Sequence, residues 1–171
     1  MKIKLLIIML IIYIPISSNT IKLDGSLYLE PLAKPGISIA PIYSIALPKR
    51  QILDISLPKI TYFYYPDNYN AIYIYPEITY RYNFKNKMNL GLFTGAGLSL
   101  SKKVVPVYNM DGELISDPFL PQLFLKAGIT TGYTYLNNMF YLSIGWKGLY
   151  PYNLSIQNQP FFEFGYQRRV K

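Results

Sequence analysis

The chain has 171 residues, of which 17 are Lys or Arg, 9 are Asp or Glu, and none is Cys or His. This length suits one domain with a real core. The absence of Cys excludes disulfides and thiolate chemistry, and the absence of His excludes Ser-His-Asp catalysis, Cys-His catalysis and His-ligated zinc. Charged residues make up 15% of the chain, against about 25% in a typical soluble domain, while hydrophobic residues make up 51%. The composition therefore indicates a chain that keeps part of its surface out of water.

The first segment has the pattern of a secretory signal peptide. Lys2 and Lys4 precede an unbroken apolar run over residues 5–14, which a proline ends and small polar residues follow. The run is too short for a membrane-spanning helix, which needs about 20 apolar residues. An N-terminal anchor that stays attached is the alternative interpretation. The sequence predicts a signal peptide over residues 1–18 and a mature domain over residues 19–171.

The rest of the chain alternates with period two, which is the signature of strands with one apolar face. In residues 71–83 the even positions are apolar or aromatic and the odd positions are polar or amphipathic, and residues 88–101 repeat the pattern. Both segments reach the length of about 9–11 residues that a tilted strand needs to cross a bilayer. The alternation predicts eight strands, over residues 20–31, 36–47, 51–64, 71–83, 88–101, 119–135, 139–147 and 159–168.

The links between these predicted strands differ in length in a regular way. Links 48–50, 84–87 and 136–138 are short. Of the other links, 102–118 and 148–158 are longer, and 32–35 and 65–70 are of modest length. Outer-membrane barrels have short periplasmic turns and longer outer loops, and inside a membrane the strands must close because an open edge would leave backbone groups unsatisfied. The sequence therefore predicts an all-β fold: a closed antiparallel up-and-down transmembrane β-barrel of about eight strands, with its N-terminus on the periplasmic side.

Three prolines fall inside the predicted strands: Pro41, Pro58 and Pro76. A closed barrel has no free edge at which a missing N–H donor is harmless. The apolar phase also slips at Pro58-Lys59, which indicates a bulge. Bulges, rim positions and strand extensions beyond the membrane are the open ways to place these prolines. They also favour the alternative hypothesis, a soluble secreted or periplasmic β-barrel that binds an apolar ligand.

The alternation also divides charged and aromatic side chains between two faces. Charges inside a barrel must pair or be hydrated, and Tyr and Trp collect at membrane interfaces. The charges predicted to face the barrel interior are Glu77, Arg81, Lys126, Lys147 and Glu163. The aromatic residues predicted to lie at the membrane interfaces are Tyr80, Tyr82, Tyr133, Tyr135, Trp146 and Tyr166.

A signal peptide, glycine- and aromatic-rich alternating strands and an even number of strands together resemble the small eight-stranded outer-membrane barrels of the OmpX, OmpA-barrel and OmpW type. The resemblance covers the whole mature chain. It implies a place in the bacterial outer membrane, with outer-membrane lipids and the barrel-assembly machinery as partners. Such barrels usually finish on a terminal aromatic residue. Here Phe162, Phe164 and Tyr166 alternate as expected, but the sequence then continues Arg168-Arg169-Val170-Lys171.

Barrel enzymes of this size, such as lipid A acyltransferases and deacylases, phospholipases and omptin-type proteases, rely as families on a histidine that this sequence lacks. We therefore expect a non-enzymatic protein with a structural or adhesive role, or a narrow passage for small solutes. No cofactor and no nucleic-acid partner is predicted. The candidate region for a surface ligand is loop 102–118, in which Asp111, Glu113 and Asp117 offer oxygen atoms to a cation. Because Asp111-Gly112 is also an ordinary turn signal, no metal site is predicted.

Overall fold

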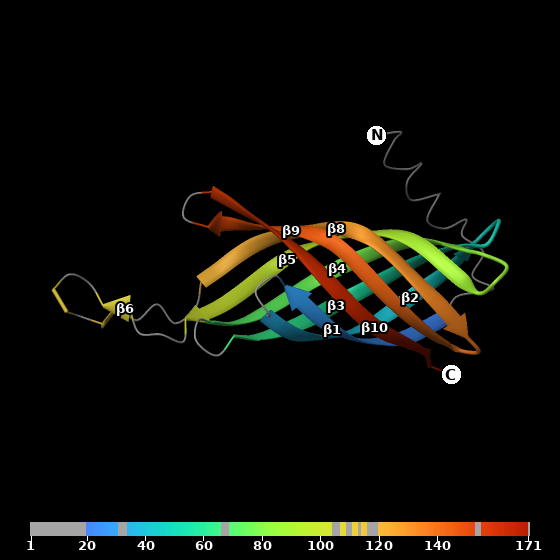
Figure 1. Ribbon diagram of the computed structural model, residues 1–171, viewed down its shortest axis with the longest axis horizontal. Helices are drawn as coiled ribbons and strands as arrows, with labels where there is room; N and C mark the ends of the chain where they lie inside the picture. Colours follow the sequence, from blue (N-terminus) through green and yellow to red (C-terminus); the bar gives the residue numbers. More distant parts are fainter. Residues whose placement is uncertain are drawn as a thin grey trace, which may run out of the picture.

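Eight long strands form a closed barrel in the computed structural model, which describes residues 20–30, 34–65, 69–103, 107–108, 111–112, 114–115, 120–152 and 155–170 (Figure 1). Each long strand is antiparallel to its neighbours, and the first pairs with the last to close the barrel. The predicted fold class is confirmed. The long strands are β1 (Thr20–Glu30), β2 (Lys34–Leu47), β3 (Gln51–Tyr65), β4 (Tyr69–Asn83), β5 (Met88–Lys103), β8 (Leu120–Tyr135), β9 (Asn138–Tyr152) and β10 (Ser155–Arg169).

One predicted link is wrong. Residues 148–158 were expected to form a longer outer loop, but β9 continues to Tyr152 and β10 begins at Ser155. Gly148 and Pro151 favour turns, yet the two strands continue to pair in this region, for example at Gly148 and Asn158. Pairing satisfies the backbone groups of both strands, and this outweighs the local turn preference. The long link after β5 contains a short hairpin of β6 (Val107–Tyr108) and β7 (Leu114–Ile115).

The two ends of the barrel differ in their connections. The turn end, as we call it, carries the short turns 48–50, 84–87 and 136–137 together with the start of β1 and the finish of β10. The opposite end, the loop end, carries the link that contains β6 and β7 (Figure 1). The short turns join strands that pair directly, so they fix the register of the adjacent ladders.

The three prolines lie at one irregularity that crosses neighbouring strands. The register of β3 shifts against β2 and against β4 around the Leu57-Pro58 peptide, next to Pro41 on one side and Pro76 on the other. Leu57 and Pro58 both face outward, so Lys59 returns to the interior with 2% exposure. The bulge predicted at this point is confirmed. Because a bulge already interrupts the ladder, it is where a missing N–H donor costs least.

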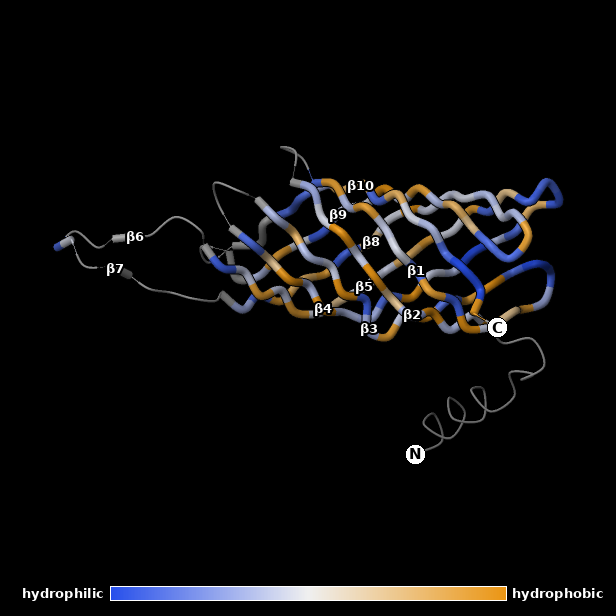
Figure 2. The backbone as a smooth tube through the Cα atoms, turned by 90° about the horizontal axis from the view of Figure 1, so that it is seen from below, coloured by the Kyte–Doolittle hydropathy of each residue, from blue (hydrophilic) through white to orange (hydrophobic). Residues whose placement is uncertain are grey.

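The outward face of the barrel is an apolar belt. Along the described strands, the outward positions between Arg168 near the turn end and Lys102 near the loop end carry no charged side chain. Figure 2 shows the resulting alternation of hydrophobic and hydrophilic residues along each strand, with hydrophilic turns. On β5 the belt runs from Leu90 to Leu100. At about 3.3 Å per residue and a strand tilt of about 40°, that stretch gives a height of about 25 Å, the height of the apolar band in outer-membrane barrels.

No helix in the part of the chain that the structure describes is long and apolar enough to cross a membrane.

Candidate functional site

The barrel interior holds buried charges of both signs. The five predicted interior charges, Glu77, Arg81, Lys126, Lys147 and Glu163, all lie there with at most 8% exposure. They are accompanied by interior charges that the sequence analysis did not select: Lys22, Asp24, Glu30, Asp54 and Lys59. Acids and bases in these two sets balance one for one. An interior of this kind avoids the large cost of an isolated buried charge.

The centre of the interior is an ion cluster around Lys59 and Glu163. The Lys59 Nζ donates to Glu163 Oε1 at 2.5 Å and lies 3.6 Å from Asp24 Oδ2 and 3.3 Å from Glu77 Oε1. Lys126 forms ion pairs with Glu77 and, at 3.6 Å, with Glu163. Charge-assisted hydrogen bonds of this kind are roughly twice as strong as neutral ones. The cluster therefore joins side chains from five of the eight barrel strands, namely β1, β3, β4, β8 and β10.

Neutral hydroxyl groups complete this central cluster. Ser26 Oγ donates to Glu163 Oε1 at 2.6 Å, and Tyr141 Oη lies 3.1 Å from both Glu163 Oε1 and Asp24 Oδ2. These hydroxyl groups contact the same two carboxylate oxygen atoms that Lys59 Nζ approaches, so each oxygen has a cation and a hydroxyl group beside it. A buried polar network favours a single arrangement when its members are hydrogen-bonded. In this cluster Asp24 Oδ1 has no hydrogen-bond partner among the described residues.

Aromatic rings fill the cross-section next to the ion cluster. Tyr28 stacks on Phe161 at a centroid distance of 4.8 Å and meets Phe63 edge-on at 5.0 Å. Tyr73 and Tyr75 both contact Phe124, at 5.0 and 4.9 Å. The rings come from β1, β3, β4, β8 and β10, so they form a layer across the whole barrel. Such edge-on and offset contacts are favourable because each ring has a negative face and a positive edge.

Two lysines lie against this aromatic layer. The Lys126 Nζ is 4.7 Å from the ring centre of Tyr75 and 5.2–5.3 Å from those of Phe93 and Phe161. The Lys147 Nζ is 4.4 Å from the ring centre of Tyr73 and forms an ion pair with Glu30. Cations over aromatic faces are stabilised by about 2 kcal/mol when they are desolvated. The aromatic layer therefore stabilises the ammonium groups of Lys126 and Lys147 in a part of the interior from which water is excluded.

Inward glycines make room for this filling. A Cβ atom added to Gly165 would overlap the ring of Tyr141, and one added to Gly128 would overlap the ring of Phe93. A Cβ added to Gly25, which faces outward, would meet nothing within 4 Å. Small residues opposite large rings are therefore a requirement of the packed interior and not of the outer face.

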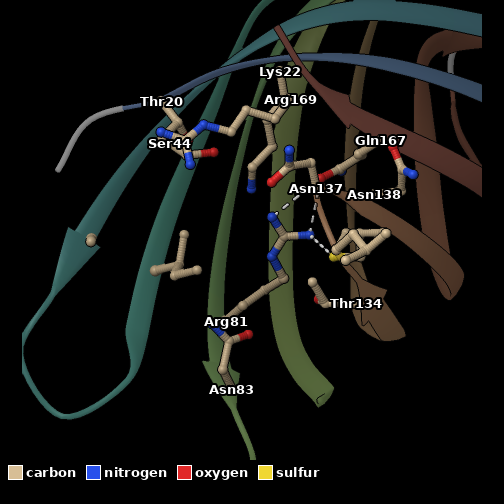
Figure 3. A pocket seen from close by; sticks show the side chains of 14 residues that line it. Thr20, Lys22, Ser44, Arg81, Asn83, Thr134, Asn137, Asn138, Gln167 and Arg169 are labelled. Carbon is tan, nitrogen blue, oxygen red and sulfur yellow. Dashed lines mark hydrogen bonds between the residues drawn. The ribbon is translucent and has the colours of Figure 1, made fainter. Parts of the chain in front are cut away.

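A polar pocket of about 250 Å³ opens at the turn end (Figure 3). Arg81 lies at its base, where it pairs with Asp54, donates to Gln167 Oε1 at 3.3 Å and contacts Met139 Sδ at 3.0 Å. Its remaining lining consists mainly of polar side chains and two further cations: Thr20, Lys22, Ser44, Asn83, Thr134, Asn137, Asn138, Gln167 and Arg169. The pocket is therefore basic and rich in hydrogen-bond donors.

The predicted interfacial aromatics lie on the outer surface, in two groups. Tyr80, Tyr82, Tyr133, Tyr135 and Tyr166 are 36–54% exposed and lie near the turn end. Trp146 is 64% exposed and lies further along β9, away from that end. On the loop side it is accompanied by outward tyrosines that the sequence analysis did not select: Tyr62, Tyr64 and Tyr150.

The missed interior charges left different signals in the sequence. Asp24 and Glu30 occupy the polar phase of β1, opposite its leucines, so their direction was readable. Lys59 was hidden because the bulge before it changes which positions face inward. Asp54 could be placed on a face, but its pairing with Arg81 depends on the register of β3 against β4.

Several predictions concern residues that the structure does not describe. The signal peptide over residues 1–18 lies within residues 1–19, outside the described chain. Glu113 and Asp117 of loop 102–118 also lie outside it, although Asp111 is described as part of a turn. Among the described residues, no group of three or more acidic side chains is arranged to hold a metal ion.

Solved structures share this architecture. Neisserial surface protein A aligns over 89% of this chain and 96% of its own with 13% identity and a TM-score of 0.51. The N-terminal β-barrel domain of Pseudomonas aeruginosa OprF aligns over 88% and 97% with 12% identity and a TM-score of 0.50. The outer membrane enzyme PagL aligns over 87% and 99% with 10% identity and a TM-score of 0.48. No protein-family profile and no curated protein matches the sequence.

The chain has the fold of the small eight-stranded outer-membrane β-barrels. Small barrels of this kind are just wide enough for side chains to fill. In this barrel, an ion cluster and an aromatic layer fill the interior, and a basic pocket lies open at one end. The first two can hold the barrel rigid, while the pocket is the part that a solute at the turn end can reach.

Proposed function

We propose that this protein is a non-enzymatic integral β-barrel of a bacterial outer membrane, with its turn end in the periplasm and its loops outside. The observation that carries the proposal is the uncharged outward belt of about 25 Å around an interior of paired charges. A soluble barrel that binds an apolar ligand needs the reverse arrangement, with apolar residues inside and polar residues outside. The orientation follows from the long connection between β5 and β8, because outer-membrane barrels place their longer loops outside.

The filled interior favours a structural or adhesive role over solute passage. Large side chains with less than 2% exposure occupy the cross-section, among them Tyr28, Tyr75, Phe63 and Phe161. A water-filled channel needs the lining to stand apart, as in barrels with many more strands. The absence of His throughout the sequence supports the non-enzymatic part of the proposal.

Secretion and insertion complete the proposal. The signal peptide over residues 1–18 would direct the chain across the inner membrane, and the barrel-assembly machinery would insert it among outer-membrane lipids. The alternation of Phe162, Phe164 and Tyr166 on the outward face of β10 supports a strand of the type that this machinery handles.

Fractionation of a Gram-negative host that expresses the full chain tests the location. We expect the protein in the outer-membrane fraction, extractable only with detergent, with an N-terminus near Asn19 by mass spectrometry. An unheated sample should migrate faster on an SDS gel than a boiled one, because the closed barrel resists unfolding by SDS. Recovery from the periplasm without detergent would refute the proposal.

Planar-bilayer recording tests the role. The wild-type barrel should give no discrete conductance steps, whereas a variant with Tyr28→Ala and Phe161→Ala, which removes the stacked pair from the aromatic layer, should conduct. The outward pair Phe162→Ala and Phe164→Ala is the matched control, because it removes the same kind of side chain from the belt. Steady wild-type conductance would favour the passage of small solutes.

A further inference from the structure

The pocket at the turn end has an excess of positive charge. Lys22, Arg81 and Arg169 contribute to its lining, and no acidic residue does. The nearest carboxylate, Asp54, pairs with Arg81 and lies 3.5 Å from Lys22 Nζ. One carboxylate thus serves two of the cations. Among the described residues, Arg169 forms no ion pair.

The strand register forces two of these cations together. Lys22 on β1 lies directly opposite Arg169 on β10, so the two side chains leave neighbouring strands on the same face. Like charges directly opposite each other in an antiparallel pair are destabilising. Lys22 is only 17% exposed, so solvent screens it less than a surface residue. An anion between the two cations would relieve this repulsion.

The surroundings strengthen the field at the pocket. The described turns at this end contain no acidic residue. The turns and the last strand place further basic residues around the turn end: Lys49, Arg50, Lys85, Lys87 and Arg168. A pocket surrounded by charge of one sign concentrates counter-ions of the other. The same mouth also presents neutral donors, since Asn137, Asn138 and Thr134 line it (Figure 3).

We propose that this pocket binds an oxyanion, a phosphate or carboxylate group, between Arg169, Lys22 and Arg81. A guanidinium group matches the geometry of both anions, because it can donate two parallel hydrogen bonds. The volume of about 250 Å³ exceeds the roughly 30 Å³ share of one water molecule, so the site holds the anion with part of its hydration. The oxyanion belongs to a free solute at the turn end or to a phospholipid headgroup at that face of the membrane.

The test uses the full mature barrel, folded in a detergent without phosphate such as lauryldimethylamine oxide. Sodium phosphate, and in a second series sodium acetate, replaces sodium chloride at constant ionic strength while amide NMR shifts are followed. We expect a saturable response at Lys22, Arg81, Asn138 and Arg169. Arg169→Gln should weaken phosphate binding by about tenfold, the worth of one charged hydrogen-bonding partner.

Arg168→Gln is the matched control. It removes the same charge one position earlier, from a side chain that faces outward and does not line the pocket. We expect it to weaken binding less than twofold. An equal loss in both variants would show a diffuse charge effect and overturn the proposal, as would a linear, unsaturated response of the wild type.

A lipid arm separates the two sources of the anion. The barrel is placed in nanodiscs of phosphatidylcholine and, separately, of phosphatidylglycerol. If the natural ligand is a free solute, the barrel responds to added phosphate in both lipids. A headgroup in the pocket instead abolishes that response and leaves shifts at Lys22 and Arg169 that depend on the lipid. The proposed membrane location is tested separately by fractionation, so either result can fail without the other.

Discussion

The buried pair of Glu30 and Lys147 tests whether interior charges stabilise the barrel only as partners. Their side chains are 1% and 0% exposed, and they pair near the loop end. Lys147 also donates to Tyr73 Oη at 2.7 Å and lies 4.4 Å from the centre of that ring. Glu30 Oε2 has no hydrogen-bond partner among the described residues. The two charges therefore depend on each other unequally.

Lys147→Met should lower the free energy of unfolding by about 3–5 kcal/mol, because it leaves Glu30 as an uncompensated buried charge. Glu30→Leu should cost less, because Lys147 keeps Tyr73 and its aromatic surroundings. The double variant should return to within about 1 kcal/mol of the wild type or exceed it, since replacing a whole buried pair by apolar residues is often neutral or stabilising. The coupling free energy between the two sites is then at least about 2 kcal/mol.

Equilibrium urea unfolding of barrels in phosphatidylcholine vesicles measures these differences. Trp146 is the only tryptophan and points away from the pair into the belt, so its fluorescence reports transfer from lipid to water in every variant. The reasoning fails if the two single losses simply add in the double variant. It fails equally if Lys147→Met unfolds at the same urea concentration as the wild type.

Three further outcomes follow from the two faces of the barrel. Ala96→Arg, in the middle of the belt, should cost about 2–4 kcal/mol in the same urea assay, and an unchanged midpoint would mean that Ala96 does not face lipid. Gly165→Ala should sharply reduce the fast-migrating band on an unheated SDS gel because its Cβ meets Tyr141, whereas Gly25→Ala should leave that band unchanged; equal bands would refute the packing argument. Lipids brominated in their acyl chains should quench Trp146 more strongly than aqueous iodide does, and the opposite order would place this side chain in water.

Alternation made the architecture predictable. Leu90, Leu92 and Leu98 all point outward from β5. Because successive side chains of a strand point to opposite faces, the residues between outward positions face the interior. The directions of Glu77 and Lys126 could be read from the same rule. These features depend on the local chain alone, which is why one sequence was enough.

Partners inside the barrel could not be predicted in this way. Ser26 and Glu163 share a hydrogen bond although 137 positions separate them. Their meeting depends on the register of every strand between them, and one bulge at Pro58 is enough to change which residues face inward. The basic pocket was missed for the same reason, since Lys22 and Arg169 become neighbours only when the barrel closes.

The pairing of β1 with β10 closes the barrel with partners such as Leu29 and Phe162, which come from the first and the last strand of the barrel. No hairpin turn helps to bring these two strands together, and ring closure over so long a segment carries a large entropic cost. We therefore expect this seam to be the slow step of assembly. Until β10 has emerged, the edge of β1 stays open, so a newly made chain needs protection against pairing with other chains for that whole interval.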